Sequence, residues 1–313
     1  MGFYSKKKQR SITDEEVANR LDVTVRTSAQ PHASMTVIRM NSSYMELVDA
    51  NFNIRGFFSA YGIFVSACIL FIVLYFPINL AWDLISNPDY PNKEGALISV
   101  IMFPIVFGLG GGGALFWAMK ASAEWFGYTH YPIRLNRKTR TVYVYRDKGT
   151  YLEVPWDSTF FAVRTIKQVG PLSFYGIAGL VLKDPTTVQD WFIFGYSSGA
   201  KKYVYRYWEF VRRYMEDGPQ AVADADGMRF YLPIADKREP ILQAWTGIRG
   251  NDGWNPLYKW IMTPFHILQF IGRMFNRLVS KVPLWPEEVE AACRIEPNDP
   301  WERDSRRNPE GYR

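Results

Sequence analysis

The sequence predicts an α+β membrane protein in which a two-helix transmembrane hairpin is followed by a mostly antiparallel β domain. Two long segments without a charged side chain, residues 56–82 and 95–119, predict the two transmembrane helices. Segments with the alternation and composition of strands follow them. Two later segments repeat apolar residues every three or four positions, and these predict a closing helix and a C-terminal amphipathic helix.

The composition limits the classes of protein to which the chain can belong. Its mean hydropathy of −0.17 is that of a soluble protein, so any membrane part must be local. A net charge of +6 favours an anionic partner, either nucleic acid or a membrane surface. Because the cations flank apolar segments, we expect the lipid bilayer as a partner and no nucleic acid. Cys68 and Cys293 are the only cysteines, too few for a disulfide framework or a zinc site.

The two uncharged segments are each longer than the roughly 20 residues that cross a hydrocarbon core of about 30 Å. A buried helical hairpin in a soluble core would need polar faces, which neither segment has. Pro77 and Pro104 are tolerated in membrane helices, where neighbours and local adjustments satisfy the freed carbonyls. Gly108 and the glycines at 110–113 predict that the second helix approaches the first closely.

The flanking charges predict the orientation of this hairpin. Cations precede the first segment and follow the second, at Arg39, Arg55, Lys120, Arg134, Arg137, Lys138 and Arg140. The linker, residues 83–94, holds one lysine and three acids. Because cytoplasmic flanks carry the excess of Lys and Arg, both termini should be cytoplasmic and the linker external. Residues 1–50 then form a polar cytoplasmic arm, which lacks the apolar stretch of a cleavable signal peptide.

Residues 130–218 predict a cytoplasmic β-rich domain that ends in a helix. The expected strands cover residues 132–135, 141–146, 151–154, 160–164, 176–183 and 189–194. The expected helix covers residues 202–216, and its apolar face is formed by Val204, Tyr207, Trp208, Val211 and Met215. This order of strands and one closing helix resembles that of pleckstrin-homology-like domains.

A basic turn lies between the first two expected strands, at Arg137, Lys138 and Arg140, close to Arg134. Some pleckstrin-homology-like domains hold a lipid headgroup at this position, so the resemblance implies a lipid or partner contact there. The positive charge expected beside a cytoplasmic membrane face explains the same cations without any ligand. Both interpretations stay open.

Residues 228–296 predict a helical segment whose main element is an amphipathic helix at about residues 255–282. Its apolar stripe contains Leu257, Ile261, Phe265, Leu268, Ile271, Phe275, Leu278 and Val282, and its polar stripe contains the cations Lys259, Arg273 and Arg277. No acid lies between Asp252 and Glu287, so a helix in the anionic inner-leaflet interface is expected. A helix packed in the core of the domain or against the hairpin is the alternative. The charged tail, residues 297–313, is expected to be disordered.

No pattern of catalytic or metal-binding residues stands out. The three histidines, His32, His130 and His266, lie in three different segments, and no H-E-x-x-H, G-x-S-x-G, Walker or Rossmann pattern occurs. Asp157 is a candidate catalytic acid, but the end of a strand and the cap of a turn is the favoured role. We therefore expect no enzyme, no cofactor and no metal.

Four short segments resemble a known group of proteins. They are residues 131–137, 142–144, 154–157 and 285–289. They are similar to an uncharacterised family of proteobacterial inner-membrane proteins, and the resemblance spans roughly residues 40–295. Members have a membrane hairpin ahead of a cytoplasmic domain and are often encoded beside type VI secretion components and effectors. The resemblance implies a multi-pass protein of the bacterial inner membrane.

The same resemblance implies an immunity protein of a type VI secretion toxin pair. Such a protein binds its cognate toxin or a secretion component at the inner membrane, which requires only a complementary surface in the right compartment. The alternative is a lipid-sensing or scaffolding membrane protein that uses the pleckstrin-like domain. An enzyme that acts on membrane lipids is a third and weaker hypothesis. The oligomeric state stays open.

Overall fold

A computed structural model shows an α+β protein with two long apolar helices and two antiparallel sheets. The structure describes residues 9–121, 124–169, 171–228, 230–250 and 256–310. The chain divides into two compact units. Unit 1 contains residues 55–127 and 248–280, and unit 2 contains residues 3–54, 128–247 and 281–313. The sequence predicted a hairpin followed by a separate domain. In the structure, the β-rich unit 2 instead includes residues before the hairpin as well as after it.

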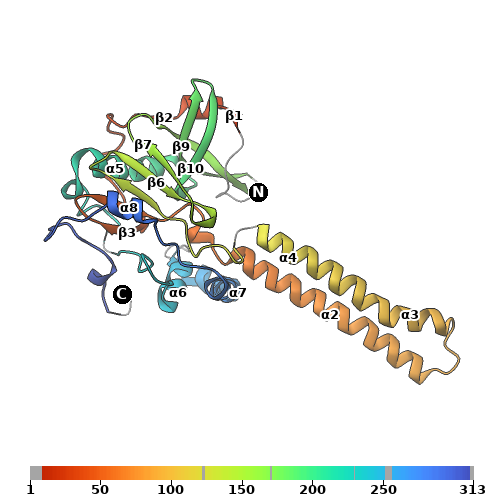
Figure 1. Ribbon diagram of the computed structural model, residues 1–313. Helices are drawn as coiled ribbons and strands as arrows, with labels where there is room; N and C mark the ends of the chain where they lie inside the picture. The colour runs from red at the N-terminus through yellow and green to blue at the C-terminus, as the bar shows by residue number, and fades with distance from the viewer. Residues whose placement is uncertain (1–8, 122–123, 170, 229, 251–255, 311–313) are drawn as a thin grey trace. The chain divides into compact units, whose positions relative to one another are not determined.

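Unit 2 contains two five-stranded sheets in which all neighbouring strands are antiparallel (Figure 1). One sheet has the order β1 (Arg10–Ser11), β10 (Thr187–Ser198), β9 (Leu172–Asp184), β8 (Phe160–Val169) and β2 (Arg20–Leu21). The other has the order β3 (Val37–Met40), β4 (Tyr44–Leu47), β5 (Ile133–Asn136), β6 (Thr141–Tyr145) and β7 (Tyr151–Pro155). The six strands from β5 to β10 occupy the segments in which the sequence predicted strands.

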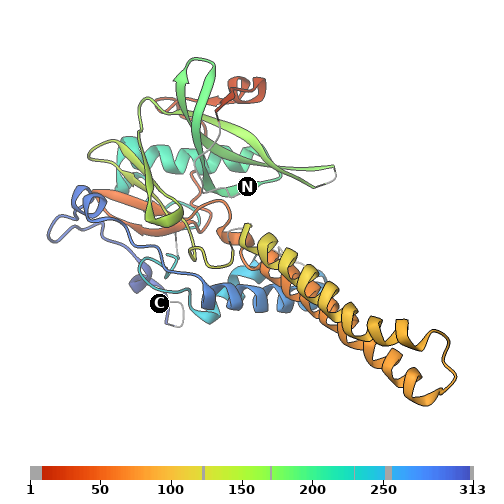
Figure 2. The same cartoon turned by 45° about the vertical axis from the view of Figure 1, so that its right-hand side comes forward.

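The helix α5 (Lys201–Asp217) contributes to the core that both sheets share (Figure 2). The face predicted from its periodicity is buried, and Trp208 on that face stacks on Trp156 at 5.4 Å between ring centroids. Phe161 of β8 lies 4.9 Å from the same Trp208 ring. Aromatic pairs of this kind add about 0.5–1.5 kcal/mol beyond the area that they bury. The closing helix of the prediction is therefore confirmed.

The first 50 residues do not form the expected polar arm. They contain the helix α1 (Asp14–Ala18) and the strands β1, β2, β3 and β4. Strand β4 pairs with β5, with Leu47 opposite Ile133. The long apolar helices are therefore inserted in the sequence between β4 and β5, two strands that are hydrogen-bonded neighbours in one sheet. Strands of two to four residues are too short to show a period of two, and the charges within β3 and β4 made this segment look like a solvated arm.

The C-terminal tail, predicted to be disordered, is bound to unit 2 up to residue 310, the last residue described. Arg303 and Met40 exchange backbone hydrogen bonds of 2.8 and 2.9 Å. The side chain of Asn308 bonds both backbone groups of Tyr231, at 2.7 and 2.9 Å. The tail is held by polar and backbone hydrogen bonds and not by a run of apolar residues, so its charged composition did not indicate that it would be ordered. Two short elements lie near the C-terminus, α8 (Glu287–Ala292) and the 3-10 turn η5 (Ser305–Arg307).

The other short helical turns of unit 2 are η1 (Phe52–Ile54), η3 (Asp147–Gly149) and η4 (Pro219–Ala221).

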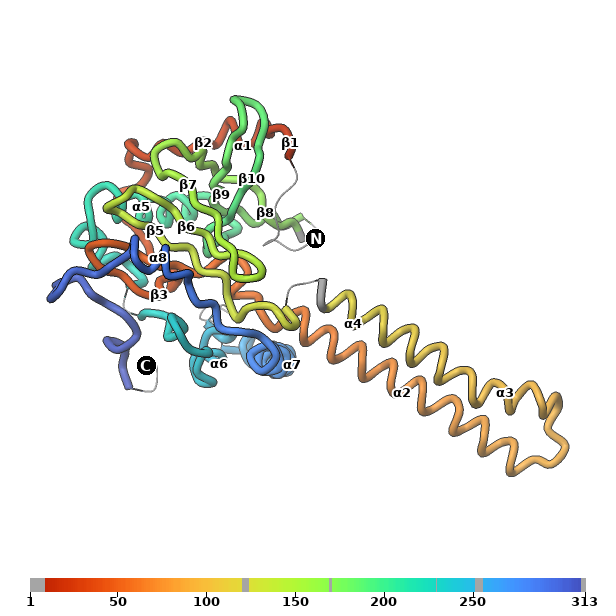
Figure 3. The backbone as a smooth tube through the Cα atoms, viewed as in Figure 1, coloured from red at the N-terminus to blue at the C-terminus, as the bar shows by residue number. Residues whose placement is uncertain are grey.

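Unit 1 contains an apolar hairpin whose two arms run side by side (Figure 3). The first arm is α2 (Phe57–Ser86), and the second runs without a break through α3 (Lys93–Phe103), the π-helix η2 (Pro104–Gly111) and α4 (Gly112–Ala121). Both arms are long and apolar enough to cross a membrane, on the basis of length and composition. The loop between them, residues 87–92, is shorter than the linker predicted at 83–94 because the helices extend into it.

The glycine run of the second arm contributes less to the contact between the arms than predicted. A methyl group added at Gly108 or Gly111 would only touch Val73 or Ile69 at ordinary contact distances, and at Gly110, Gly112 and Gly113 it would meet open space. The close approach lies at the other end of the hairpin. A methyl group at Gly62 would come within 2.5 Å of the Met119 sulfur. The first arm, not the second, therefore supplies the small residue where the helices are closest.

The predicted amphipathic helix is α7 (Pro256–Val279), which also belongs to unit 1 and follows α6 (Ile241–Gly250). It runs across the base of the hairpin. Figure 1 shows α2 lengthwise and α7 nearly end-on, and the turned view in Figure 2 shows α7 from the side. A methyl group at Gly272 would lie 2.3 Å from the Gly56 carbonyl oxygen and 2.4 Å from the Ala60 nitrogen. The two backbones can cross this closely only because Gly272 has no side chain.

Candidate functional site

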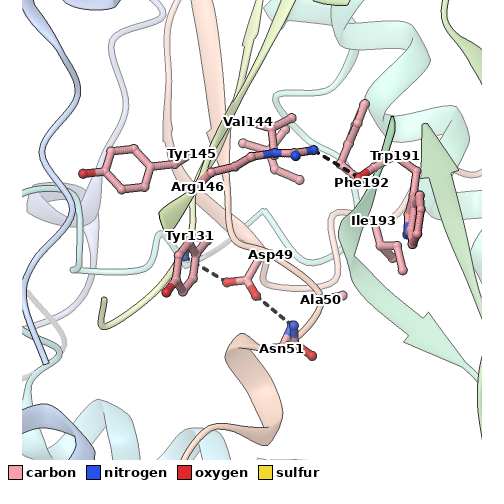
Figure 4. Close-up of a pocket in the computed structure, with 11 residues that line it drawn as sticks. Asp49, Ala50, Asn51, Tyr131, Val144, Tyr145, Arg146, Trp191, Phe192 and Ile193 are labelled. Atoms are coloured by element: carbon pink, nitrogen blue, oxygen red, sulfur yellow. Dashed lines mark hydrogen bonds between the residues drawn. The ribbon is translucent and has the colours of Figure 1, made fainter. Parts of the chain in front are cut away.

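A small cavity lies between the two sheets of unit 2 (Figure 4). Asp49 accepts hydrogen bonds from the backbone N–H groups of Tyr131 and Asn51, at 3.1 and 2.9 Å. On the opposite side the buried Arg146 forms a two-pronged ion pair with Asp190, with both N···O distances 2.8 Å. The cavity is small, with a volume of about 30 Å³.

A wider groove of about 590 Å³ lies on the surface of unit 2, between residues 29–31, the side of α5 and residues 220–226. Asp226 lies 3.2 Å from His32 and 3.4 Å from Arg206, so these two side chains share one carboxylate. The groove is polar and open, which suits a protein contact better than an enclosed small ligand. Among the described residues, no three His, Cys, Asp or Glu side chains are grouped so that they could hold a metal ion.

The basic turn predicted to contact lipid is largely occupied by ion pairs within unit 2. Arg140 donates to Asp157 at 2.8 and 2.9 Å and to Glu216 at 2.8 Å. Lys138 is paired with Glu296. The side chain of Arg137 is half-buried. Lys138 and Arg140 are thus held by carboxylates of the protein, an arrangement that does not favour a headgroup site at these two cations.

Asp157 lies in the turn that directly follows β7, which agrees with the favoured hypothesis of a residue at the end of a strand. Its carboxylate pairs with Arg140, and this hydrogen bond lowers the pKa of Asp157. A carboxyl with a lowered pKa stays ionised at neutral pH and is a poor proton donor. The neighbouring Trp156, from the same short motif, is buried in the core. The motif is therefore explained by packing and by one ion pair.

The fourth cation, Arg134, is buried in a charged cluster on the second sheet of unit 2. Its guanidinium donates to Glu46 and to Glu290, at 3.0 Å each, and lies 4.5 Å from the ring of Tyr44. Burial acts to lower the pKa of Arg134, but Glu46, Tyr44 and Glu290 together outweigh it and the pKa is raised. A side chain held in this way from three sides cannot reach a lipid or a partner. The prediction of a contact at Arg134 therefore conflicts with its burial.

The carboxylate of Glu46 is the centre of this cluster. It accepts from Arg39 at 2.8 Å, from Arg134, and from the indole N–H of Trp285 at 3.1 Å. Burial acts to raise the pKa of Glu46, but the guanidiniums of Arg134 and Arg39 outweigh it and the pKa is lowered. Trp285 and Glu290 belong to the C-terminal segment that includes α8. The cluster thus fastens that segment to the sheet, which explains the Trp-Pro-Glu-Glu-Val motif at residues 285–289.

A second buried polar cluster lies at the base of the hairpin, within unit 1. The Glu124 carboxylate accepts from the backbone N–H groups of Gly56 and Ser59, at 3.2 and 2.8 Å, and from the Ser59 hydroxyl at 2.6 Å. It therefore caps the N-terminus of α2, where unpaired N–H groups and the helix dipole favour an anion. The Glu124 carbonyl accepts from the side chains of Asn276 and of Ser280, the latter at 3.1 Å.

The polar side chains of α7 face inward, toward this cluster. Asn276 and Arg273 are buried beside α2, as is His266 on the same side of α7, and the Gly272 backbone lies against Ala60. Lys259 and Arg277 are half-buried. Of the three α7 cations predicted to contact lipid or a partner, Arg273 is therefore enclosed by the protein, whereas the other two remain at the surface.

Residues 114–297 match DUF6708, a family of unknown function, over more than half of the chain. The chain belongs to the DUF6708 family. No curated protein and no solved structure matches it.

The DUF6708 match contains Glu124, Arg134, α7 and the residues 285–289, so part of each buried cluster lies in the family region. The remaining members lie before it: Arg39, Tyr44, Glu46, Gly56 and Ser59. Neither Glu46 nor Glu124 was selected from the sequence as a functional residue. A signal for both was available in the sequence. Glu46 is a single acid among apolar residues, and Glu124 is a single acid shortly after the second apolar segment. If such an isolated charge is buried, it requires a partner.

Proposed function

We propose that this DUF6708 protein is a membrane-anchored binding protein of the bacterial inner membrane. The apolar hairpin would span the bilayer, and unit 2 would lie with both termini in the cytoplasm. The observation that carries the proposal is the exposure of large apolar side chains along both arms, such as Ile85 at 78% and Leu109 at 74%. At 1.5 Å per residue, the 30 residues of α2 extend about 45 Å, more than a hydrocarbon core of about 30 Å.

The orientation is supported by the charges beside the hairpin. Arg55 directly precedes α2 and Lys120 ends the second arm, whereas the loop and its flanks contain Asp83, Asp89 and Glu94 against Lys93. A cytoplasmic excess of Lys and Arg within short flanks favours this direction.

A topology experiment tests the anchor. Cys68 lies in the middle of α2 with an exposed side chain, and Cys293 is buried in unit 2. With both changed to Ser, a single cysteine at Asp89 should react with a membrane-impermeant maleimide in spheroplasts. A cysteine at Thr186, in the exposed turn between β9 and β10, should react only after lysis. Labelling at position 186 in intact spheroplasts, or full release of the protein by carbonate, would refute the proposed anchor.

For the molecular role we propose immunity against a type VI secretion toxin. The resemblance of residues 131–137 and 285–289 to inner-membrane proteins encoded near such effectors motivates it. The open polar groove of unit 2 supports it, since a protein contact needs a solvent-accessible surface of this kind. Deletion of the gene in a strain that carries the neighbouring toxin gene should cause self-intoxication, and a plasmid copy should restore growth. Normal growth of the deletion strain under active secretion would exclude this role.

Lipid sensing through a pleckstrin-homology-like fold is the second candidate. The run of antiparallel strands β4 to β10 followed by α5 supports the likeness in element order. The ion pairs of Lys138 and Arg140 weaken the case for a headgroup at the basic turn. Charge reversal at Arg137 and Lys138 should weaken flotation with anionic vesicles in a salt-sensitive manner if this candidate is right. Unchanged flotation of the reversed protein would remove the turn as a lipid site.

A further inference from the structure

The helix α7 has its two faces arranged opposite to those of a helix in a soluble protein. Its polar side chains His266, Arg273 and Asn276 are buried, as described above. The apolar stripe predicted from the sequence is the outward one, with Leu257 65% and Phe265 64% exposed. An amphipathic helix of a soluble domain turns its apolar stripe toward the core. Part of the stripe does contact unit 1, since Phe275 packs on Trp125 at 5.2 Å between ring centroids, but over residues 257–271 its side chains are mostly exposed.

The exposed apolar side chains of α7 gather on one side of the helix over residues 257–271, and Leu278 follows beyond the packed Gly272 and Phe275. The large ones are Leu257, Trp260, Ile261, Phe265, Ile267, Ile271 and Leu278. At 100° per residue these positions fall within one half of the helix circumference. An apolar face that extends over several turns indicates an interaction surface, because isolated exposed apolar residues are ordinary whereas contiguous ones are not. We call this set the α7 outer face.

The position of α7 in unit 1 favours lipid as the occupant of this face. The helix crosses α2 at Gly56 and Ala60, where the hairpin would enter the bilayer, and it runs across the hairpin axis (Figures 1 and 2). The first turns of α2 expose Phe57 and Tyr61 beside this crossing. The α7 outer face thus continues the apolar surface of the hairpin at the level of the membrane boundary.

The charge and aromatic content of α7 point to an anionic bilayer surface. Residues 256–286 contain no acid, whereas Lys259 and Arg277 lie at the surface of α7. Tyr258 and Trp260 are exposed at 46% and 77%, and these side chain types are enriched at the headgroup level of membranes.

We propose that α7 lies along the cytoplasmic surface of an anionic bilayer, with the α7 outer face in the boundary between headgroups and acyl chains. Helices of this type bury their apolar face by about 5–10 Å, and anionic lipids attract the adjoining cations. The polar face, bound to Glu124 and the start of α2, fixes α7 at that depth. The proposal rests on the proposed membrane anchor and adds to it a third contact with the membrane.

Site-specific fluorescence in vesicles tests the proposal with the full-length chain. Variants with one cysteine each, in a background with Cys68→Ser and Cys293→Ser, carry an NBD label at Ile261 or Phe265. A label at Thr186 in the same background serves as the aqueous reference, and a label at the native Cys68 in the protein with Cys293→Ser alone serves as the reference for the hairpin. The protein is reconstituted into vesicles of phosphatidylcholine and phosphatidylglycerol at a ratio of 7:3. Because positions 261 and 265 are exposed, the labels leave the packing of unit 1 intact.

The labels at 261 and 265 should lose at least half of their emission when the lipids are brominated and should resist iodide in the water phase. The label at 186 should show the reverse. Quenching of the 261 label by iodide would overturn the proposal in favour of a solvent-exposed face. Protection from both quenchers would overturn it in favour of a protein partner or a second copy. If the Cys68 label is quenched by brominated lipid and the α7 labels are not, the anchor stands and this inference alone fails; if Cys68 also fails, the anchor is wrong.

Discussion

At the scale of single residues, the buried carboxylate of Glu46 is the group on which unit 2 depends most directly. Two guanidiniums and one indole N–H bind it, and the residue has no exposed surface. Glu46→Gln removes the charge that offsets Arg39 and Arg134. The loss of one partner of a buried pair costs on the order of 3–5 kcal/mol. We expect the free energy of unfolding of the full chain in detergent, measured with urea, to fall by about this amount.

The matched control is Glu302→Gln, which breaks an exposed pair with Arg306. An exposed pair contributes roughly 0–1 kcal/mol, so this variant should differ little from the wild type. Equal losses in Glu46→Gln and Glu302→Gln would mean that the cluster stabilises no more than a surface pair does.

The lowered pKa of Glu46 also predicts the direction of a pH effect. A carboxyl whose pKa is lower in the folded state stabilises the protein above the unfolded pKa of about 4.3, and this contribution is lost as pH falls through the folded pKa. The wild type should therefore lose stability on acidification below about pH 4.3 more steeply than Glu46→Gln. Parallel unfolding curves for both proteins from pH 6 to pH 3 would contradict the ionised state of Glu46.

Glu124 is the corresponding residue of unit 1, where it caps α2. Glu124→Ala leaves the N–H groups of Gly56 and Ser59 without their acceptor, and loss of a helix cap costs about 0.5–2 kcal/mol. We expect faster hydrogen exchange in the first turn of α2, measured by mass spectrometry in detergent. Asn92→Ala removes the side-chain cap at the start of α3 and should raise exchange there but not at residues 57–60. Unchanged exchange at 57–60 in Glu124→Ala would show that the cap contributes nothing.

At the scale of elements, the crossing of α7 over α2 depends on one glycine. Gly272→Ala would place a methyl group against backbone atoms of Gly56 and Ala60, which cannot rotate away. Overpacking of this kind costs about 1–3 kcal/mol. We expect α7 itself to become sensitive to limited proteolysis. Gly112→Ala, where a methyl group meets open space, is the control and should behave like the wild type.

The elements that the sequence predicted correctly are those with long periodic segments, namely the strands β5 to β10, α5, α7 and both arms of the hairpin. Strands β3 and β4 were missed because Arg39 and Glu46 lie within four-residue strands, where a charge hides the alternation. The two faces of α7 were also predicted, but periodicity cannot state which face is buried. That depends on Glu124, whose carbonyl accepts from Asn276 across 152 residues of sequence, and no local pattern reveals such a partner.

The candidate site residues show the same limit. Arg134, Lys138 and Arg140 have the expected charge, but their carboxylate partners come from Glu46, Glu296 and Glu216. Each partner lies on a different segment of the chain, so composition near the turn suggested unpaired cations. Tertiary pairing decided their role, and the paired state became visible only once β4 and the C-terminal segment were placed beside the turn.

At the scale of the whole molecule, the chain leaves unit 2 twice to form unit 1, at residues 55–127 and 248–280, and returns to unit 2 each time. Within unit 2, the residues on either side of the first stretch meet, because Asp49 binds the Tyr131 N–H and Phe52 packs on His130 at 6.4 Å between rings. After the second stretch the chain returns at Lys281, which pairs with Tyr128 in a β-bridge. The closing contacts therefore come from unit 2 itself and do not require the apolar helices.

This topology predicts that unit 2 folds without unit 1. Replacement of residues 55–127 and 248–280 by short Gly-Ser linkers should give a water-soluble protein with a cooperative thermal transition, because β4 still pairs with β5 and the Glu46 cluster is complete. A fragment limited to residues 130–218 is the contrasting case. It lacks β3, β4 and Trp285, so β5 becomes an unpaired edge, Arg134 loses both carboxylates, and we expect aggregation. Circular dichroism and size-exclusion chromatography of both proteins separate the outcomes. A folded, monomeric 130–218 fragment would show that the strands before the hairpin are dispensable, and an insoluble linker protein would show that unit 2 needs unit 1.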